Sequence, residues 1–120
     1  MQNDGYGKDR EARISKEIKR LNKILKPKEN PKLMTAQRLI ENVAFMSIHL
    51  QDLQAELNEN GCTEKYQNGE NQYGVKKSAA FDAYTSTVKN YMTAIKQLVD
   101  AAPDGVVQDD LSILISGGRR

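Results

Sequence analysis

The chain has 120 residues, of which 38% are hydrophobic and none is tryptophan, and its mean hydropathy is −0.69. This length suffices for one small domain with a thin core, so we expect oligomerisation to compensate for marginal stability. The single cysteine, Cys62, excludes an internal disulfide framework. The polar N-terminus predicts no signal peptide, and no apolar run approaches the roughly 20 residues that cross a bilayer, so we expect a soluble intracellular protein without a membrane partner.

The net charge of +2 conceals an uneven distribution of charge along the chain. Residues 8–32 contain ten Lys or Arg and four Asp or Glu, whereas residues 33–120 contain eight and eleven. A basic arm on a mildly acidic body is typical of a protein that binds a polyanion, with nucleic acid as the leading candidate. The alternative is a lysine-rich helix face that only contacts solvent.

The first predicted element is an amphipathic helix from the N-cap Asp9 to Leu25, ended by Pro27 and preceded by a flexible lead-in over residues 1–8. Its apolar stripe consists of Ile14, Ile18, Leu21 and Leu25. Helical periodicity places a second group on nearly the opposite face, namely Arg13, Lys16, Arg20 and Lys23. We predict contacts with DNA phosphates for Arg10, Arg13, Lys16, Lys19, Arg20, Lys23, Lys26 and Lys28.

The second predicted helix begins at Asn30-Pro31, an N-cap followed by proline at the first helical position, and runs to about Asn58. Its coiled-coil a and d positions hold Ala36, Leu39, Val43, Met46, Leu50, Leu53 and Leu57. A second apolar flank consists of Leu33, Ile40, Ala44 and Ile48. So wide an apolar surface needs two partners. The next helix supplies one, and either the first helix or a neighbouring subunit supplies the other.

Residues 58–77 are polar and rich in Gly and Asn, which predicts a long loop. Ser78 is the predicted N-cap of a third helix that stops at Pro103. The a and d positions of this helix hold Tyr84, Val88, Tyr91, Ile95, Leu98 and Ala102.

These elements predict an all-α fold in which a basic N-terminal helix precedes a long antiparallel helical hairpin. The expected division is a lead-in and basic helix over residues 1–30, the hairpin over 31–103, and a docking tail over 104–120. The hairpin is the expected oligomerisation core, through Leu39, Ile40, Val43, Met46, Leu50, Leu53, Leu57, Tyr84, Val88, Tyr91, Ile95 and Leu98. In the tail, an apolar patch either contacts a partner or closes the chain's own fold; it consists of Leu111, Ile113, Leu114 and Ile115.

No catalytic centre, metal site or cofactor is indicated by the sequence. It contains neither a Walker-type phosphate loop nor a Rossmann glycine pattern. We expect His49 to be an ordinary surface histidine on a polar face with Arg38, Ser47 and Glu56, and Cys62 to be unreactive. Asp109-Asp110 is interpreted as solubilising charge. A small enzyme is therefore the weakest of the functional alternatives.

The segment GENQYGVKKSAAFDAYTSTVKNYMTAIKQLVDAAP resembles the C-terminal half of the small terminase subunits of tailed bacteriophages and prophages. The matching residues are Gly74, Lys76-Lys77, Ser78, Tyr84, Lys89-Asn90-Tyr91 and Pro103. The resemblance implies a non-catalytic DNA-packaging factor, without a cofactor, in the cytoplasm of a bacterial host. Such a protein assembles into a ring, binds double-stranded viral DNA, and recruits and regulates the terminase large subunit. The alternative is a helical adaptor that binds another protein and no nucleic acid.

Overall fold

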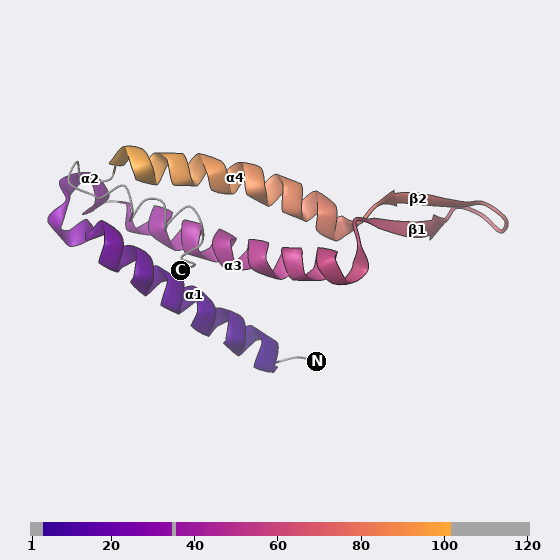
Figure 1. The fold of residues 1–120 in the computed structure, drawn as a ribbon, viewed down its shortest axis with the longest axis horizontal. Helices are drawn as coiled ribbons and strands as arrows, with labels where there is room; N and C mark the ends of the chain where they lie inside the picture. The colour runs from indigo at the N-terminus through magenta and orange to yellow at the C-terminus, as the bar shows by residue number, and fades with distance from the viewer. Residues whose placement is uncertain (1–3, 35, 102–120) are drawn as a thin grey trace.

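The computed structural model describes residues 4–34 and 36–101 of the chain. Over these residues the chain is mostly helical, with four α-helices, one 3-10 turn and a two-stranded sheet (Figure 1). The expectation of a mainly helical fold is confirmed, whereas the sheet was not predicted. None of the helices in these two ranges is long and apolar enough to cross a membrane.

Helix α1 spans Asp4–Leu25 and begins earlier than the predicted N-cap at Asp9. The predicted flexible lead-in is therefore wrong from Asp4 onward. Gly5 and Gly7 each weaken a helix by about 1 kcal/mol but do not interrupt its hydrogen bonds. The helix ends at Leu25, as predicted. Lys26 then adopts a left-handed conformation with φ of 47°, and the 3-10 turn η1 occupies Pro27–Glu29.

Residues 31–58 do not form the single helix that was predicted. Helix α2 spans Pro31–Met34, and helix α3 spans Gln37–Asn60. Between them the chain makes a tight 3-10-type turn, in which the Ala36 N–H donates to the Leu33 carbonyl three residues earlier, at 3.0 Å. The turn allows α2 to lie across one end of the bundle, where its Leu33 is fully buried.

Asn30 caps α2 as the sequence predicted, since its Oδ1 accepts a hydrogen bond from the Lys32 N–H at 3.2 Å. The same buried side chain donates from Nδ2 to the Ala101 carbonyl at 2.8 Å. Ala101 is the last residue of α4, which spans Ala79–Ala101. Asn30 therefore joins the start of α2 to the end of α4.

The predicted loop over residues 58–77 contains a two-stranded antiparallel β-ribbon. Strand β1, Thr63–Gln67, pairs with strand β2, Tyr73–Lys77. Residues 68–72 connect the two strands; within them the Asn68 N–H donates to the Gln72 carbonyl at 2.7 Å, and Gly69 adopts a φ of +110°. The ribbon projects beyond the ends of α3 and α4 (Figure 1).

Ser78 is the N-cap of α4, as predicted, because its Oγ accepts a hydrogen bond from the Phe81 N–H at 3.0 Å. Helices α3 and α4 lie side by side, and α1 lies along another side of α3 (Figure 1). The predicted positions Ala102 and Pro103 lie outside the described residues.

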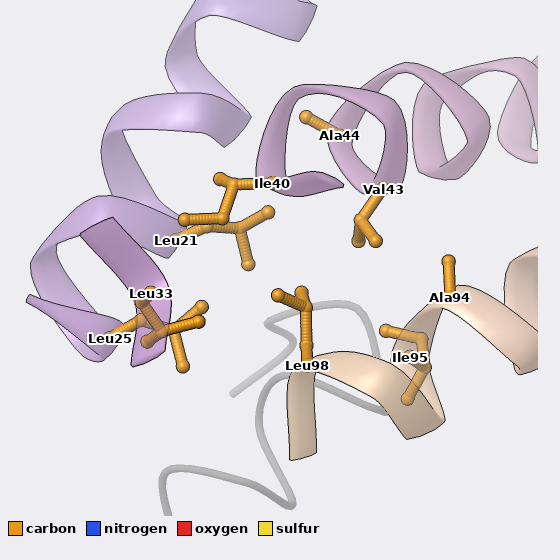
Figure 2. Close-up of a cluster of buried hydrophobic side chains, with 9 residues drawn as sticks. All are labelled: Leu21, Leu25, Leu33, Ile40, Val43, Ala44, Ala94, Ile95 and Leu98. Atoms are coloured by element: carbon orange, nitrogen blue, oxygen red, sulfur yellow. The ribbon is translucent and has the colours of Figure 1, made fainter. Parts of the chain in front are cut away.

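The core lies at the end of the molecule where all four helices meet (Figure 2). Leu21 and Leu25 of α1 are fully buried and pack in one cluster with Ile40 and Ala44 of α3 and Leu98 of α4. Helix α1 therefore covers the second apolar flank of α3. The sequence left open whether the first helix or a neighbouring subunit covers this flank. In the structure, the chain's own first helix covers it.

Candidate nucleic-acid interface

Two arginines of α1 form ion pairs with one carboxylate of α3, that of Asp52. Arg13 donates from Nη1 to Asp52 Oδ1 at 2.8 Å and from Nη2 to Gln51 Oε1 at 2.9 Å. Arg10 Nε lies 3.1 Å from Asp52 Oδ2. The sequence predicted DNA-phosphate contacts for both residues, and the structure places them beside α3, where Asp52 pairs with each. They hold α1 on α3 in addition to contributing positive charge.

Beside these ion pairs, a groove of about 400 Å³ lies between α1 and α3, and we call it the basic groove. It is lined by Arg13, Lys16, Glu17, Lys19, Arg20, Lys23, Ile48 and Gln51. All four residues of the predicted basic ridge belong to this lining, so the structure brings them together as their spacing indicated. The lining contains five cationic side chains and one carboxylate; Asp52 beside it pairs with Arg13 and Glu17 pairs with Arg20, so the net positive charge comes from the three lysines.

The five cations differ in how available they are to a ligand. Arg20 donates from Nη2 and Nε to the Glu17 carboxylate at 2.6 and 2.9 Å. This hydrogen bond raises the pKa of Arg20, and burial offsets the increase only in part. The guanidinium therefore stays charged, but one carboxylate neutralises part of its field. Lys16, Lys19 and Lys23 are exposed and are the cations of the groove most accessible to an anion.

Lys26 and Lys28, the last two residues of the predicted DNA-binding set, lie apart from the basic groove. Both are exposed, and both line a second hollow of about 570 Å³ at the corner after α1, together with Asn22, Glu29 and Gln37. The predicted DNA-binding residues therefore lie in three places. Some pair with Asp52, some line the basic groove, and Lys26 and Lys28 line the hollow after α1.

His49 is half-buried, contrary to the expectation of an ordinary surface histidine. Its ring stacks on Phe45 with a centroid distance of 6.0 Å and an interplanar angle of 17°. Its Nδ1 lies 3.5 Å from Arg10 Nη2. Ser47, which was placed on the same polar face, is buried, and its side chain forms a hydrogen bond with Tyr91 of α4. Among the described residues, no three His, Cys, Asp or Glu side chains are grouped to hold a metal ion.

The residues predicted for oligomerisation lie in the chain's own packing. Six are buried: Ile40, Val43, Leu50, Leu53, Ile95 and Leu98. The other six are half-buried: Leu39, Met46, Leu57, Tyr84, Val88 and Tyr91. The predicted docking patch at Leu111, Ile113, Leu114 and Ile115 and the pair Asp109-Asp110 lie outside the described residues.

Sequence reasoning missed the contribution of α3 to the basic groove. Gln51 and Ile48 line it, and Asp52 fixes the two arginines beside it. Arg13 and Asp52 are 39 residues apart, and no local pattern relates them. Only the packing of α1 on α3 brings them together.

Comparisons of the chain with protein families, with curated proteins and with solved structures find no match.

Proposed function

We propose that this chain is a non-catalytic DNA-packaging protein of the small terminase type, which binds double-stranded DNA through the basic groove. The observation that carries the proposal is the gathering of Arg13, Lys16, Lys19, Arg20 and Lys23 around one groove with a single carboxylate. Flexible lysines on such a surface suit phosphate oxygens, whose neutralisation releases counterions and makes binding steeply dependent on salt. Both arginines of the lining are engaged by carboxylates of the chain, so the three exposed lysines supply most of the affinity through phosphates.

In this proposal α3 and α4 form a helical hairpin that assembles copies of the chain into a ring. Leu57, Tyr84 and Val88 are half-buried, and α1 diverges from α3 towards its own N-terminus (Figure 1). These side chains keep apolar surface that a second copy can cover. Repetition of the basic groove around a ring raises a weak single contact to a useful avidity. The assembled protein recruits and regulates the large subunit, which carries the ATPase and the nuclease.

The DNA-binding part is tested by fluorescence anisotropy of a labelled duplex, titrated with the full chain between about 50 and 200 mM salt. The test variant is the double substitution Lys16→Gln and Lys23→Gln. The matched control is Lys89→Gln and Lys96→Gln, which removes the same charge from exposed positions on α4. We expect the groove variant to bind about tenfold more weakly and its salt slope to fall by about two, with the control close to wild type.

Light scattering with and without DNA tests the assembly. A discrete species of many subunits that takes up DNA at low salt supports the packaging proposal. A monomer or dimer that is indifferent to DNA contradicts it. That result favours a helical adaptor, an alternative that also explains why Asp52 engages two of the arginines within the chain.

A further inference from the structure

The two faces of the β-ribbon differ in how many of their side chains contact other residues of the chain. Side chains alternate between faces along a strand, and paired residues share a face. The register therefore assigns Glu64, Tyr66, Gly74 and Lys76 to one side, which we call the closed face. It assigns Thr63, Lys65, Gln67, Tyr73, Val75 and Lys77 to the other side, which we call the open face.

The closed face is covered by contacts within the ribbon. The Tyr66 ring lies over Gly74, where an added Cβ would approach Tyr66 Cζ to 2.6 Å. Lys76 Nζ lies 5.9 Å from the centroid of the same ring and 3.7 Å from Glu64 Oε2. An aromatic ring placed over a cross-strand glycine is a known way to stabilise a sheet edge. The closed face thus carries no net charge, and its one large apolar side chain, Tyr66, is 42% exposed.

The open face keeps apolar groups and cations exposed. Tyr73 and Val75 are 72% and 64% exposed, the largest values among the exposed large apolar residues of the described chain. Lys65 and Lys77 lie on the same face, and no carboxylate shares it. A shallow hollow of about 500 Å³ is lined by Lys65, Tyr73, Gly74 and Val75.

A carboxylate outside the ribbon, that of Asp82, forms an ion pair with a lysine of the open face. It lies 3.7 Å from Lys77 Nζ at the start of α4, and both side chains are more than half exposed. An exposed pair of this kind contributes little and does not prevent Lys77 from contacting a phosphate.

Charge decides which partner suits the open face. A second ribbon packed face to face would add the Lys65 and Lys77 of that copy to a face that holds two lysines and no carboxylate, and this concentration of like charge is unfavourable. A polyanion complements the same two lysines. The ribbon is two strands wide, and a two-stranded ribbon fits the major groove of duplex DNA, which is about 12 Å wide.

We propose that the open face of the β-ribbon is a second DNA-binding surface, which enters a groove of duplex DNA and acts in addition to the basic groove. Lys65 and Lys77 contact phosphates on the groove walls, and Tyr73 and Val75 make apolar contact with sugars and base edges. This proposal rests on the proposed function, because it assumes that duplex DNA is the ligand.

The test compares single substitutions that each remove one positive charge from the ribbon. Lys65→Gln and Lys77→Gln change the open face, and Lys76→Gln, one residue from Lys77, changes the closed face. We expect each open-face variant to bind a labelled duplex several-fold more weakly and to lower the salt slope by about one, with Lys76→Gln close to wild type. Equal losses in all three variants would show a general charge effect and would overturn the proposal.

Tyr73→Ser provides an independent measurement, because it removes apolar contact without changing charge. We expect weaker binding with an unchanged salt slope, and unchanged binding contradicts the inserted-ribbon arrangement. If this substitution instead dissociates an oligomer in light scattering, the open face is a contact between copies and the proposal is wrong.

Cys62, exposed just before β1 and the chain's single cysteine, can carry an environment-sensitive fluorophore. A signal change on adding duplex to the full chain, lost in the double variant of Lys65→Gln and Lys77→Gln, supports the proposal. If the chain binds DNA through the basic groove and the fluorophore does not respond, the ribbon proposal fails and the proposed function stands. If the wild-type chain does not bind duplex DNA at low salt, both fail.

Discussion

Arg13 and Asp52 form a hydrogen-bonded ion pair between α1 and α3, with Nη1 and Oδ1 2.8 Å apart. Arg10 Nε lies 3.1 Å from the other oxygen of the same carboxylate. One acidic residue of α3 thereby fixes the N-terminal half of the most basic helix. By pairing with Arg10 and Arg13, it also lowers the positive charge that α1 presents to an external ligand. The side chains are between 21% and 31% exposed, so solvent screens the attraction in part.

Asp52→Asn is expected to weaken the attachment of α1 and to strengthen DNA binding. Loss of the charged acceptor lowers the free energy of unfolding by about 1 kcal/mol, because the pair is only partly screened. Arg10 and Arg13 then lose their ion pairs with Asp52, while Arg13 Nη1 keeps Asp9 Oδ2 3.7 Å away, and the local charge becomes more positive. Urea denaturation measures the stability, amide hydrogen exchange measures the opening of α1, and duplex anisotropy measures the affinity.

Glu56→Gln is the matched control for that substitution, since it removes one negative charge from an exposed position on the same helix. We expect it to leave exchange in α1 unchanged. An equal gain in DNA affinity from both variants would show that net charge, rather than release of the two arginines, is responsible.

Leu98→Ala is expected to destabilise the chain by about 2–5 kcal/mol, because it leaves a cavity at a fully buried position. Leu98 packs in the cluster that joins α4 to α1 and α3. The shift of the urea midpoint measures the effect. Met92→Ala on the same helix is the control, since Met92 is 54% exposed and its loss costs little. Equal shifts in the two variants would contradict the described packing of α4.

Tyr91 is expected to make stability fall at alkaline pH. Burial raises the pKa of Tyr91 above its ordinary value of 10.0, and the hydrogen bond with Ser47 opposes this only in part. The unfolded chain therefore loses this proton first as pH rises. Its contribution to stability is complete below the unfolded pKa and is lost as pH rises through the higher folded pKa.

Urea denaturation between about pH 8 and pH 11 measures this effect. Tyr91→Phe removes the titrating group, so its stability is expected to depend less on pH than that of the wild type. Tyr73→Phe, at an exposed position, is expected to keep the wild-type dependence. Parallel curves for the wild type and Tyr91→Phe would rule out Tyr91 as the source.

Gly74→Ala is expected to disturb the closed face of the ribbon without unfolding the helices. The added Cβ would approach the outer end of the Tyr66 ring to 2.6 Å, so the ring has to move away. Because the ribbon is exposed, we expect a loss of global stability below about 1 kcal/mol. NMR measures the change, since ring currents from Tyr66 shift the Gly74 Hα signals of the wild type. If Tyr66→Leu leaves those signals in place, the ring does not lie over Gly74.

The helix boundaries that depend on local chemistry could be predicted from the sequence. Ser78 and Asn30 were identified as N-caps because their side chains accept nearby backbone N–H groups, and both do so in the structure. The ribbon was missed because its polar strands carry no alternation of core residues, and because residues 68–72 connect the strands without a two-residue hairpin turn. The basic ridge of α1 was also readable, since helical spacing alone places its four members on one side.

By itself, the sequence determined the end of α1, the N-caps of α2 and α4, which residues are apolar enough for a core, and where positive charge is concentrated. These properties depend on contacts between residues a few positions apart. The tertiary structure decided which element covers the second flank of α3 and which arginines are held by Asp52. It also decided which face of the ribbon is left open. Those outcomes depend on side chains far apart in the chain, whose approach is fixed by the packing of whole helices and by strand register, and no local pattern encodes either.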